Sequence, residues 1–156
     1  VVSVEPSVRK VDQEERKNMT HFDFICRVTY GDTDRMGISY YANYLKWFES
    51  ARTEYFRALG FPYVECEKRG LFLPVIEAHV KYHAPSTYDD LLIVRTSVAQ
   101  LRKSSIRFEY QVINKATHRQ LVTGYTVLAF VDKSFQLTYV PEEIEKAVKC
   151  HKLLEK

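Results

Sequence analysis

One segment of the chain decides how the rest is interpreted: residues 30–44, which read YGDTDRMGISYYANY. Its first half is rich in turn formers, among them Asp32, Asp34 and Gly37. The residues before this segment and the residues after it follow different hydrophobic periods. The segment therefore predicts a connection between a β-strand and an α-helix.

The flanking residues carry these two periods. Residues 21–30, HFDFICRVTY, alternate loosely and are rich in aromatic and β-branched side chains, which predicts a first strand. Residues 41–59 predict one amphipathic helix, about 28 Å long at 1.5 Å per residue, which Gly60 and Pro62 would end. Its polar positions are Lys46, Glu49, Ser50, Thr53, Glu54 and Arg57, and its apolar positions are Tyr44, Leu45, Phe48, Ala51, Tyr55 and Leu59.

The second half of the chain alternates with the period of strands. Four runs predict strands, at residues 71–82, 91–99, 106–112 and 121–131, and the short turns between them predict an antiparallel meander. A last helix is expected over residues 141–154, because the run starts with proline and acids and ends with lysines. The class is therefore α+β, with one long helix lying across a curved antiparallel sheet of about five strands.

Composition sets wider limits on the protein. The 156 residues are 46% hydrophobic and 28% charged with a formal net charge of +3, which excludes a fully disordered chain. The longest apolar runs, such as residues 127–131, are far shorter than the roughly 20 residues of a membrane span, and the N-terminus lacks the apolar core of a signal peptide. Positive and negative residues are interleaved, which speaks against nucleic-acid binding. We expect a cytoplasmic protein.

The domain organisation follows from the same composition. Residues 1–20 are polar without a clear period, which predicts a flexible N-terminal arm, and residues 21–156 are expected to form a single domain. The three cysteines, Cys26, Cys66 and Cys150, lie far apart and predict reduced thiols, with neither a disulfide framework nor a zinc site. His79 and His83 lack a third ligand for a metal and are expected on one polar face of a strand with Glu77 and Lys81.

Residues 30–44 also hold a candidate for chemistry. The first N–H groups of a helix have no intrahelical acceptor and carry partial positive charge, so they polarise a carbonyl or bind an oxyanion. Asp34, just ahead of that helix, would then attack an acyl group or activate water, which suits acyl transfer. Two other interpretations stay open: Asp32, Asp34 and Gly37 as ordinary turn formers and caps, or the two carboxylates as ligands of a metal that lacks its other ligands.

These residues resemble a known family. Residues 30–44, continued by FESARTE at 48–54, resemble the signature of hot-dog-fold acyl-CoA thioesterases of the 4-hydroxybenzoyl-CoA thioesterase and YbgC-like group. Residues 82–91, YHAPSTYDDL, and the turn Arg102, Lys103 and Ser104 resemble two further segments of that family. The resemblance covers residues from about 22 to 135 and implies the hot-dog fold.

The resemblance also implies roles for particular residues. Asp34 matches the catalytic aspartate, a nucleophile or general base toward the thioester, and Gly37 stands in the signature's turn. Tyr41 stands where the family's backbone N–H polarises the carbonyl. YbgC-like members often have His at this position, so the tyrosine of this chain keeps the backbone donor but lacks their imidazole. Arg102, Lys103 and Ser104 match positions that contact the phosphates of coenzyme A. Glu49 is the reserve catalytic residue, because a related hot-dog branch uses a helical carboxylate.

The implied function is hydrolysis of an acyl-CoA to a free acid and CoA, without metal or redox cofactor. A single hot-dog unit leaves a sheet edge open, so we expect a homodimer with a continuous sheet, doubled to a homotetramer. The main alternative is a non-catalytic module that binds acyl-CoA or acyl carrier protein. A hot-dog dehydratase is a second alternative, but it needs a catalytic His and none occurs between His21 and His79.

One charged residue interrupts the predicted apolar helix face. Arg52 lies beside Phe48 and Tyr55, and a cation embedded among apolar side chains requires a partner. We expect an ion pair with Glu49 or with an acid from another strand.

Overall fold

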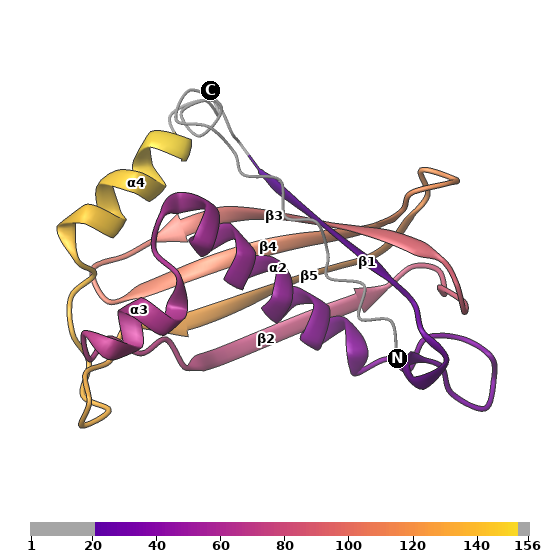
Figure 1. Cartoon of the computed structure of the whole chain (residues 1–156), viewed down its shortest axis with the longest axis horizontal. Coiled ribbons are helices and arrows are strands. Elements are labelled where there is room, and N and C mark those ends of the chain that lie inside the picture. The colour runs from indigo at the N-terminus through magenta and orange to yellow at the C-terminus, as the bar shows by residue number, and fades with distance from the viewer. Residues whose placement is uncertain (1–20, 153–156) are drawn as a thin grey trace.

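The computed structural model describes residues 21–152 of the chain. Five strands form one antiparallel sheet in the order β1-β3-β4-β5-β2, and the helix α2 lies across one face of it (Figure 1). The elements are β1 (Phe22–Arg27), α2 (Asn43–Leu59), α3 (Tyr63–Lys68), β2 (Val75–Tyr82), β3 (Leu91–Leu101), β4 (Ser105–Asn114), β5 (Gln120–Ala129) and α4 (Glu142–Lys152). The predicted α+β class and its curved five-stranded sheet are confirmed. The predicted arm at residues 1–20 and the end of the last helix, residues 153–156, lie outside the described residues.

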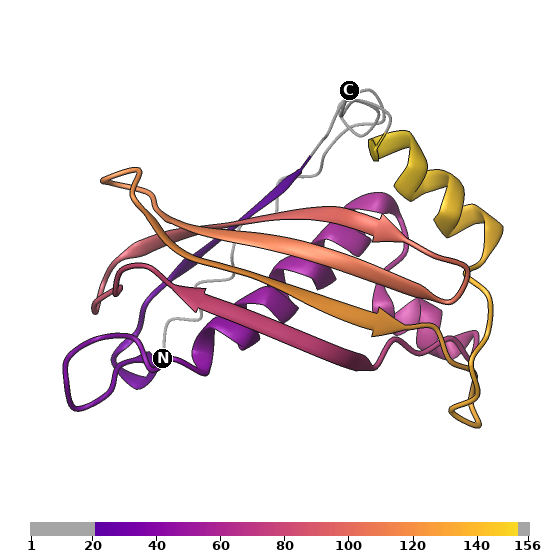
Figure 2. The ribbon, with the colours of Figure 1, turned by 180° about the vertical axis from the view of Figure 1, so that it is seen from behind.

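The alternation of the strands divides the sheet into two faces. On β4, Phe108 and Tyr110 point toward α2 and are buried, whereas Arg107 and Glu109 point to the opposite face. Within the described residues no helix covers that opposite face, and Figure 2 shows the sheet in front of α2 when the molecule is turned around. The core therefore lies between the sheet and α2.

The predicted meander is only partly right. The strands β3, β4 and β5 follow one another as neighbours, but β2 pairs with β5 and β1 pairs with β3. Residues 83–90 were expected to make a tight turn between neighbouring strands. They instead connect β2, at one edge of the sheet, to β3, which lies next to the other edge strand, β1. Alternation identifies which residues form strands, but it carries no information on which strands pair.

Helix α2 begins two residues later than predicted and ends as predicted. Its last turn is closed by Gly60, which takes the left-handed conformation with φ of +94°. Leu45 was expected on the buried side and is 39% exposed, whereas Trp47 is buried. The helix approaches the sheet closely where β5 has a glycine: a Cβ atom on Gly124 would lie 2.7 Å from the ring of Phe48.

Two short elements were not predicted, the 3-10 turn η1 (Tyr30–Asp32) and the helix α3. Both are shorter than two turns of an α-helix, so the apolar period cannot show in them. No helix among residues 21–152 is both long enough and apolar enough to cross a membrane.

Candidate active site

The loop between β1 and α2 is held at both ends by Asp32. Its carboxylate accepts hydrogen bonds from the main-chain N–H and the hydroxyl of Thr29, both at 2.8 Å. Its carbonyl oxygen accepts the main-chain N–H of Tyr40 at 2.7 Å and the side-chain amide of Asn43 at 2.8 Å. Asp32 therefore acts as a cap and turn former, which is one of the interpretations left open by the sequence, and it joins the end of the strand to the start of the helix.

Asp34 lies in a tight reverse turn of the same loop. Its main-chain N–H donates to the carbonyl of Ile38 and its carbonyl accepts the N–H of Gly37, both at 2.9 Å. One carboxylate oxygen, Oδ1, accepts the N–H of Met36 at 2.8 Å, and the other, Oδ2, has no hydrogen-bond partner in the described part of the chain. Gly37 has φ of +80°, a conformation that side chains disfavour. This turn therefore presents a half-buried carboxylate with one free oxygen.

The start of α2 is left open to a ligand. Its N-cap residue is Ala42, no side chain of the described residues caps the first turn, and the first turn holds no acidic residue. Across residues 21–152 the main-chain N–H of Tyr41 has no hydrogen-bond acceptor. The positive end of the helix dipole and the unpaired N–H of Tyr41 are thus available to a developing negative charge.

Aromatic side chains gather around this helix start. The rings of Tyr40 and Tyr41 lie 4.6 Å apart, and Tyr82 of β2 makes edge contacts with Tyr41 at 6.5 Å and with Tyr44 at 5.5 Å. A side-chain hydrogen bond to Tyr41, and then the electrostatic effect of the Tyr41 hydroxyl, raise the pKa of Tyr40, to which burial and Asp34 add less. Tyr40, Tyr41, Tyr82 and Tyr44 therefore form a chain of ring contacts at the start of α2.

Buried hydroxyl groups fix this arrangement against the segment between β2 and β3. The Ser39 and Ser86 hydroxyls are 2.6 Å apart, and the hydroxyl of Tyr44 lies 2.9 Å from that of Ser86. Ser39 and Ser86 are both buried. Sequence reasoning did not identify these serines or Tyr82 as part of the site, because their partners are more than forty residues away in the chain.

Arg102, Lys103 and Ser104 lie at the opposite end of the sheet. They form the turn between β3 and β4, while the loop before α2 adjoins the other end of β3, through the pairing of Arg27 with Leu91 (Figure 1). The eleven residues of β3 separate the two ends by about 33 Å. One chain therefore does not bring the predicted phosphate contacts to Asp34.

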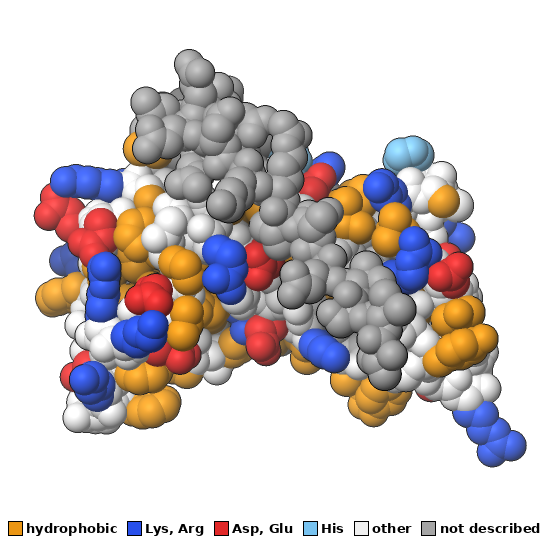
Figure 3. All heavy atoms as spheres, in the orientation of Figure 1, with side chains coloured by type: hydrophobic (Ala, Val, Ile, Leu, Met, Phe, Trp, Pro, Cys, Tyr) orange, Lys and Arg blue, Asp and Glu red, His pale blue; other side chains and the backbone are white. Residues whose placement is uncertain are grey.

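A hollow of about 700 Å³ lies beside that turn. Its lining joins cationic side chains from two elements to an aromatic ring: Leu101, Arg102, Lys103, Tyr139, Val140, Glu145 and Lys149. Tyr139 is 74% exposed. Elsewhere on the helix-bearing side, charged side chains of both signs are interspersed (Figure 3). This hollow is a suitable surface for an anionic, partly aromatic ligand.

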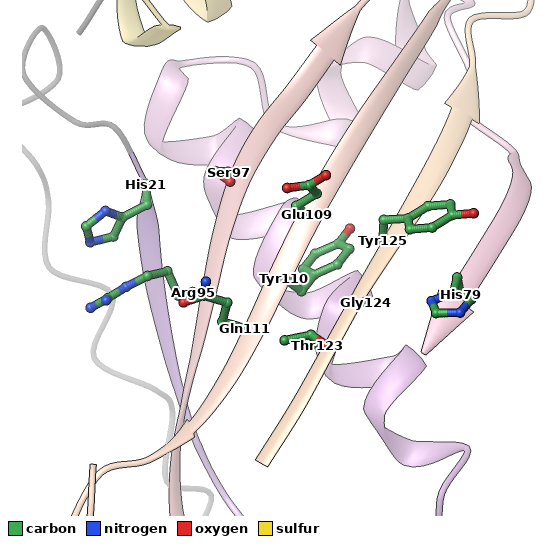
Figure 4. A pocket seen from close by; sticks show the side chains of 10 residues that line it. All are labelled: His21, His79, Arg95, Ser97, Glu109, Tyr110, Gln111, Thr123, Gly124 and Tyr125. Atoms are coloured by element: carbon green, nitrogen blue, oxygen red, sulfur yellow. The ribbon is translucent and has the colours of Figure 1, made fainter. Parts of the chain in front are cut away.

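A second hollow, of about 480 Å³, lies on the sheet face that no described helix covers, and Figure 4 shows its lining. His79 and Tyr125 stack there with ring centres 5.4 Å apart, and the Arg107 guanidinium lies 3.8 Å from the centre of the Tyr125 ring. Glu77, His79, Lys81 and His83 share this face and are exposed, as the sequence predicted. Neither hollow is lined by Asp34 or Tyr41.

Two predictions about α2 have different outcomes. Glu49 is exposed on the polar side of the helix, and no interaction joins it to the helix start among the described residues. The predicted ion pair of Arg52 is wrong: the side chain is buried, yet no carboxylate of the described chain pairs with it, and its Nε has no hydrogen-bond partner there. It lies instead beside the hydroxyl groups of Tyr63 and Tyr110, which it influences electrostatically.

The fold and the arrangement at the helix start define a class, the hot-dog thioesterases. Residues 28–148 match the model of the thioesterase-like superfamily. The chain therefore belongs to this superfamily and is a thioester hydrolase by class.

Individual relatives agree with this classification. The acyl-CoA thioesterase YbgC of Haemophilus influenzae is 33% identical over 127 residues, which cover 81% of this chain and 93% of that protein. The putative acyl-CoA thioesterase YneP of Bacillus subtilis is 37% identical over 89 residues, which cover 57% of this chain and 64% of that protein. The crystal structure of the DHNA-CoA thioesterase from Staphylococcus aureus superposes with a TM-score of 0.78 at 28% identity, covering 85% of this chain and 89% of that one.

Proposed function

We propose that this chain hydrolyses acyl-CoA thioesters, with Asp34 as the catalytic carboxylate and the N–H of Tyr41 as the group that polarises the thioester carbonyl. The observation that supports the proposal is that one loop carries both a carboxylate with a free oxygen and an uncapped helix start. The relatives named as acyl-CoA thioesterases support the substrate class. A thioester has less resonance stabilisation than an ester, so one activated water or carboxylate suffices.

The chemistry follows from these two groups. With Asp34 as general base, the free carboxylate oxygen takes a proton from water while the water oxygen attacks the carbonyl carbon. The negative charge that develops on the carbonyl oxygen faces the N–H of Tyr41 and the positive end of α2. The C–S bond then breaks, and the coenzyme A sulfur leaves as a thiolate that takes up a proton. With Asp34 as nucleophile, a mixed anhydride forms first and water cleaves it.

Arg102, Lys103 and Ser104 are proposed to bind the phosphates of coenzyme A. Because about 33 Å of β3 separates them from the loop before α2, this role requires a second copy whose turn reaches the first copy's active site. We therefore propose a cytoplasmic homodimer, doubled to a homotetramer, with each active site built from two chains. The cations and the exposed Tyr139 around that turn suit a nucleotide.

A thiol-release assay over short, long and aromatic acyl-CoAs tests the catalytic proposal. The Asp34→Asn variant should lose at least about 100-fold in kcat, because it removes the base or nucleophile, while Glu49→Gln serves as the matched control and should keep its activity. Full activity in Asp34→Asn together with a loss in Glu49→Gln would move the catalytic role to Glu49. If the native protein binds acyl-CoA but releases no thiol from any of them, the chain is a binding module instead.

Mixing two inactive variants tests the shared site. Chains with Asp34→Asn are combined with chains that carry both Arg102→Glu and Lys103→Glu, and subunits are allowed to exchange. Random pairing leaves one intact site in each mixed dimer, so about a quarter of the native activity should return. Activity that stays at the level of the two separate variants would contradict the shared site.

A further inference from the structure

The side chain of Arg52 places a positive charge inside the core. Arg52 lies on α2, one helical turn after Phe48 and one turn before Phe56, on the face that packs against the sheet. Only 7% of Arg52 is exposed, and both phenylalanines are fully buried. A guanidinium group stays protonated in proteins, so the core holds a full charge at this position.

Two tyrosines from other elements approach the same place. The ring of Tyr110 on β4 stacks on Phe48 with ring centres 4.1 Å apart, and the ring of Tyr63 on α3 packs against Phe56 at 5.0 Å. Arg52 acts electrostatically on the hydroxyl groups of both tyrosines. The guanidinium therefore lies where α2, α3 and β4 meet.

The charge of Arg52 has no counter-charge within residues 21–152. None of the ion pairs in that range includes Arg52, and Glu49, one turn earlier on the helix, is exposed on the polar side. Burial raises the pKa of the Tyr63 and Tyr110 hydroxyl groups, so both stay neutral near pH 7. The neighbouring hydroxyl groups therefore offer oxygen atoms but no negative charge.

Hydrogen-bond donors around the guanidinium are also unpaired. Nε of Arg52 and the hydroxyl group of Tyr63 are buried, and neither has a hydrogen-bond partner in the described part of the chain. The hydroxyl group of Tyr110 is already bonded to that of Thr126, at 2.7 Å. Buried donors without acceptors cost free energy, and the cost is largest for a charged group. This place therefore combines a positive charge with donors that need an acceptor.

We infer that a small monovalent anion of the halide class, chloride, binds between the guanidinium of Arg52 and the hydroxyl group of Tyr63. The anion accepts hydrogen bonds from both groups and supplies the negative charge that the guanidinium lacks. A water molecule would accept the same hydrogen bonds but would leave the charge uncompensated.

Burial selects the anion by size and by hydration. Buried aromatic rings enclose the guanidinium, so a compact ion suits the site better than phosphate or a bulky carboxylate. The free energy needed to remove an ion from water rises as its radius falls. We therefore expect chloride and bromide to bind and fluoride to bind much more weakly.

The anion site is separate from the proposed active site. Arg52 comes eleven residues after Tyr41, which corresponds to about 16 Å along α2. Tyr63 is the first residue of α3, the short helix that precedes β2. A bound anion therefore stabilises the packing of α3 against α2 and the sheet, and the inference does not depend on the hydrolase assignment.

Urea unfolding in two sodium salts tests the site. Sodium chloride is raised from 1 to 100 mM while sodium fluoride keeps the ionic strength constant. The unfolding equilibrium constant of the native protein should fall about tenfold, as a dissociation constant of about 10 mM predicts. A native protein that unfolds equally in both salts would overturn the inference, because water alone would then satisfy the donors.

Two arginine variants show whether the chloride effect arises at this site. Arg52→Met removes the charge and fills the space with an apolar side chain, so it should fold and lose the response to chloride. The matched control Arg57→Met changes an exposed arginine of the same helix and should keep the tenfold response. A chloride response that persists in Arg52→Met would contradict the inference.

Bromide gives a direct readout that does not rely on stability. In crystals of the native protein soaked in sodium bromide, anomalous scattering should show a peak within hydrogen-bonding distance of both the Arg52 guanidinium and the Tyr63 hydroxyl group. Tyr63→Phe removes one donor and should weaken the chloride dissociation constant about fivefold. Bromide peaks confined to surface side chains, or unchanged chloride affinity in Tyr63→Phe, would overturn the site.

Discussion

The hydroxyl group of Tyr82 donates a hydrogen bond of 2.9 Å to the main-chain carbonyl oxygen of Tyr41. It joins the edge strand β2 to the residue whose N–H stands free before α2. The bond therefore restrains the peptide group that follows the N–H we propose to act on the thioester, from a residue that lies forty-one positions further along the chain.

Removing this bond should lower both activity and stability modestly. Tyr82→Phe keeps the ring contacts with Tyr41 and Tyr44 but loses the hydroxyl donor. We expect kcat to fall about threefold to tenfold, because the backbone at Tyr41 would orient the thioester carbonyl less well. The bond is exposed, and its loss should cost only about 1 kcal/mol of unfolding free energy. Thiol release and urea unfolding measure the two effects. As a control, Tyr30→Phe alters an exposed tyrosine that stacks on Tyr88 and should leave kcat unchanged.

Gly37 is expected to be needed for the turn that presents Asp34. Its φ of +80° disfavours any side chain, so Gly37→Ala should cost about 1–2 kcal/mol of unfolding free energy even though a Cβ atom meets nothing within 4 Å. Gly31→Ala is the matched control, because it also meets nothing within 4 Å and Gly31 has no positive φ. Thermal unfolding and thiol release of both variants check this. Equal unfolding temperatures and equal thiol release for the two variants would mean that the positive φ of residue 37 does not require glycine.

The buried Arg52 is expected to contribute little to stability. Burying a cation costs free energy, and no carboxylate of the described chain compensates it, so Arg52→Met should unfold within about 1 kcal/mol of the native protein or be more stable. Tyr110→Phe provides the contrast, because it leaves the buried Thr126 hydroxyl without its 2.7 Å partner and should destabilise by about 1–3 kcal/mol. Denaturant unfolding measures both. A loss of more than about 3 kcal/mol in Arg52→Met would show that the cation has an anionic partner.

The thiol groups should differ sharply in reactivity. Burial, and then the nearby charge of Asp32, raise the pKa of Cys26 to about 12, so at pH 8 the reactive thiolate is almost absent. Cys150 is exposed and should react first with a disulfide reagent in the native state. The rate for Cys26 should rise with pH up to about 12, because a raised pKa shifts thiolate formation upward. Mass spectrometry after timed labelling identifies the modified cysteine, and rapid labelling of Cys26 at pH 8 would contradict the prediction.

Local patterns in the sequence determined a large part of this protein. The change from a two-residue to a helical period around residues 30–44 predicted the strand, the turn and α2, since each depends on neighbouring residues alone. Gly60 ended α2 as predicted, because a left-handed residue closes a helix by itself. The same segment also contained Asp34 and Tyr41, which lie in one loop because they are seven residues apart in the chain.

Only the tertiary structure decided what depends on distant residues. It separated β2 from β3, brought Tyr82 to Tyr41, left Arg52 without an acidic partner among residues 21–152 and placed the turn at residues 102–104 about 33 Å from the loop before α2. Strand order and side-chain partners are set by which surfaces pack best over the whole chain, and no window of the sequence contains both partners. The sequence alone thus determined the local elements and the nature of the candidate groups, whereas the pairing of the strands decided which of those groups meet.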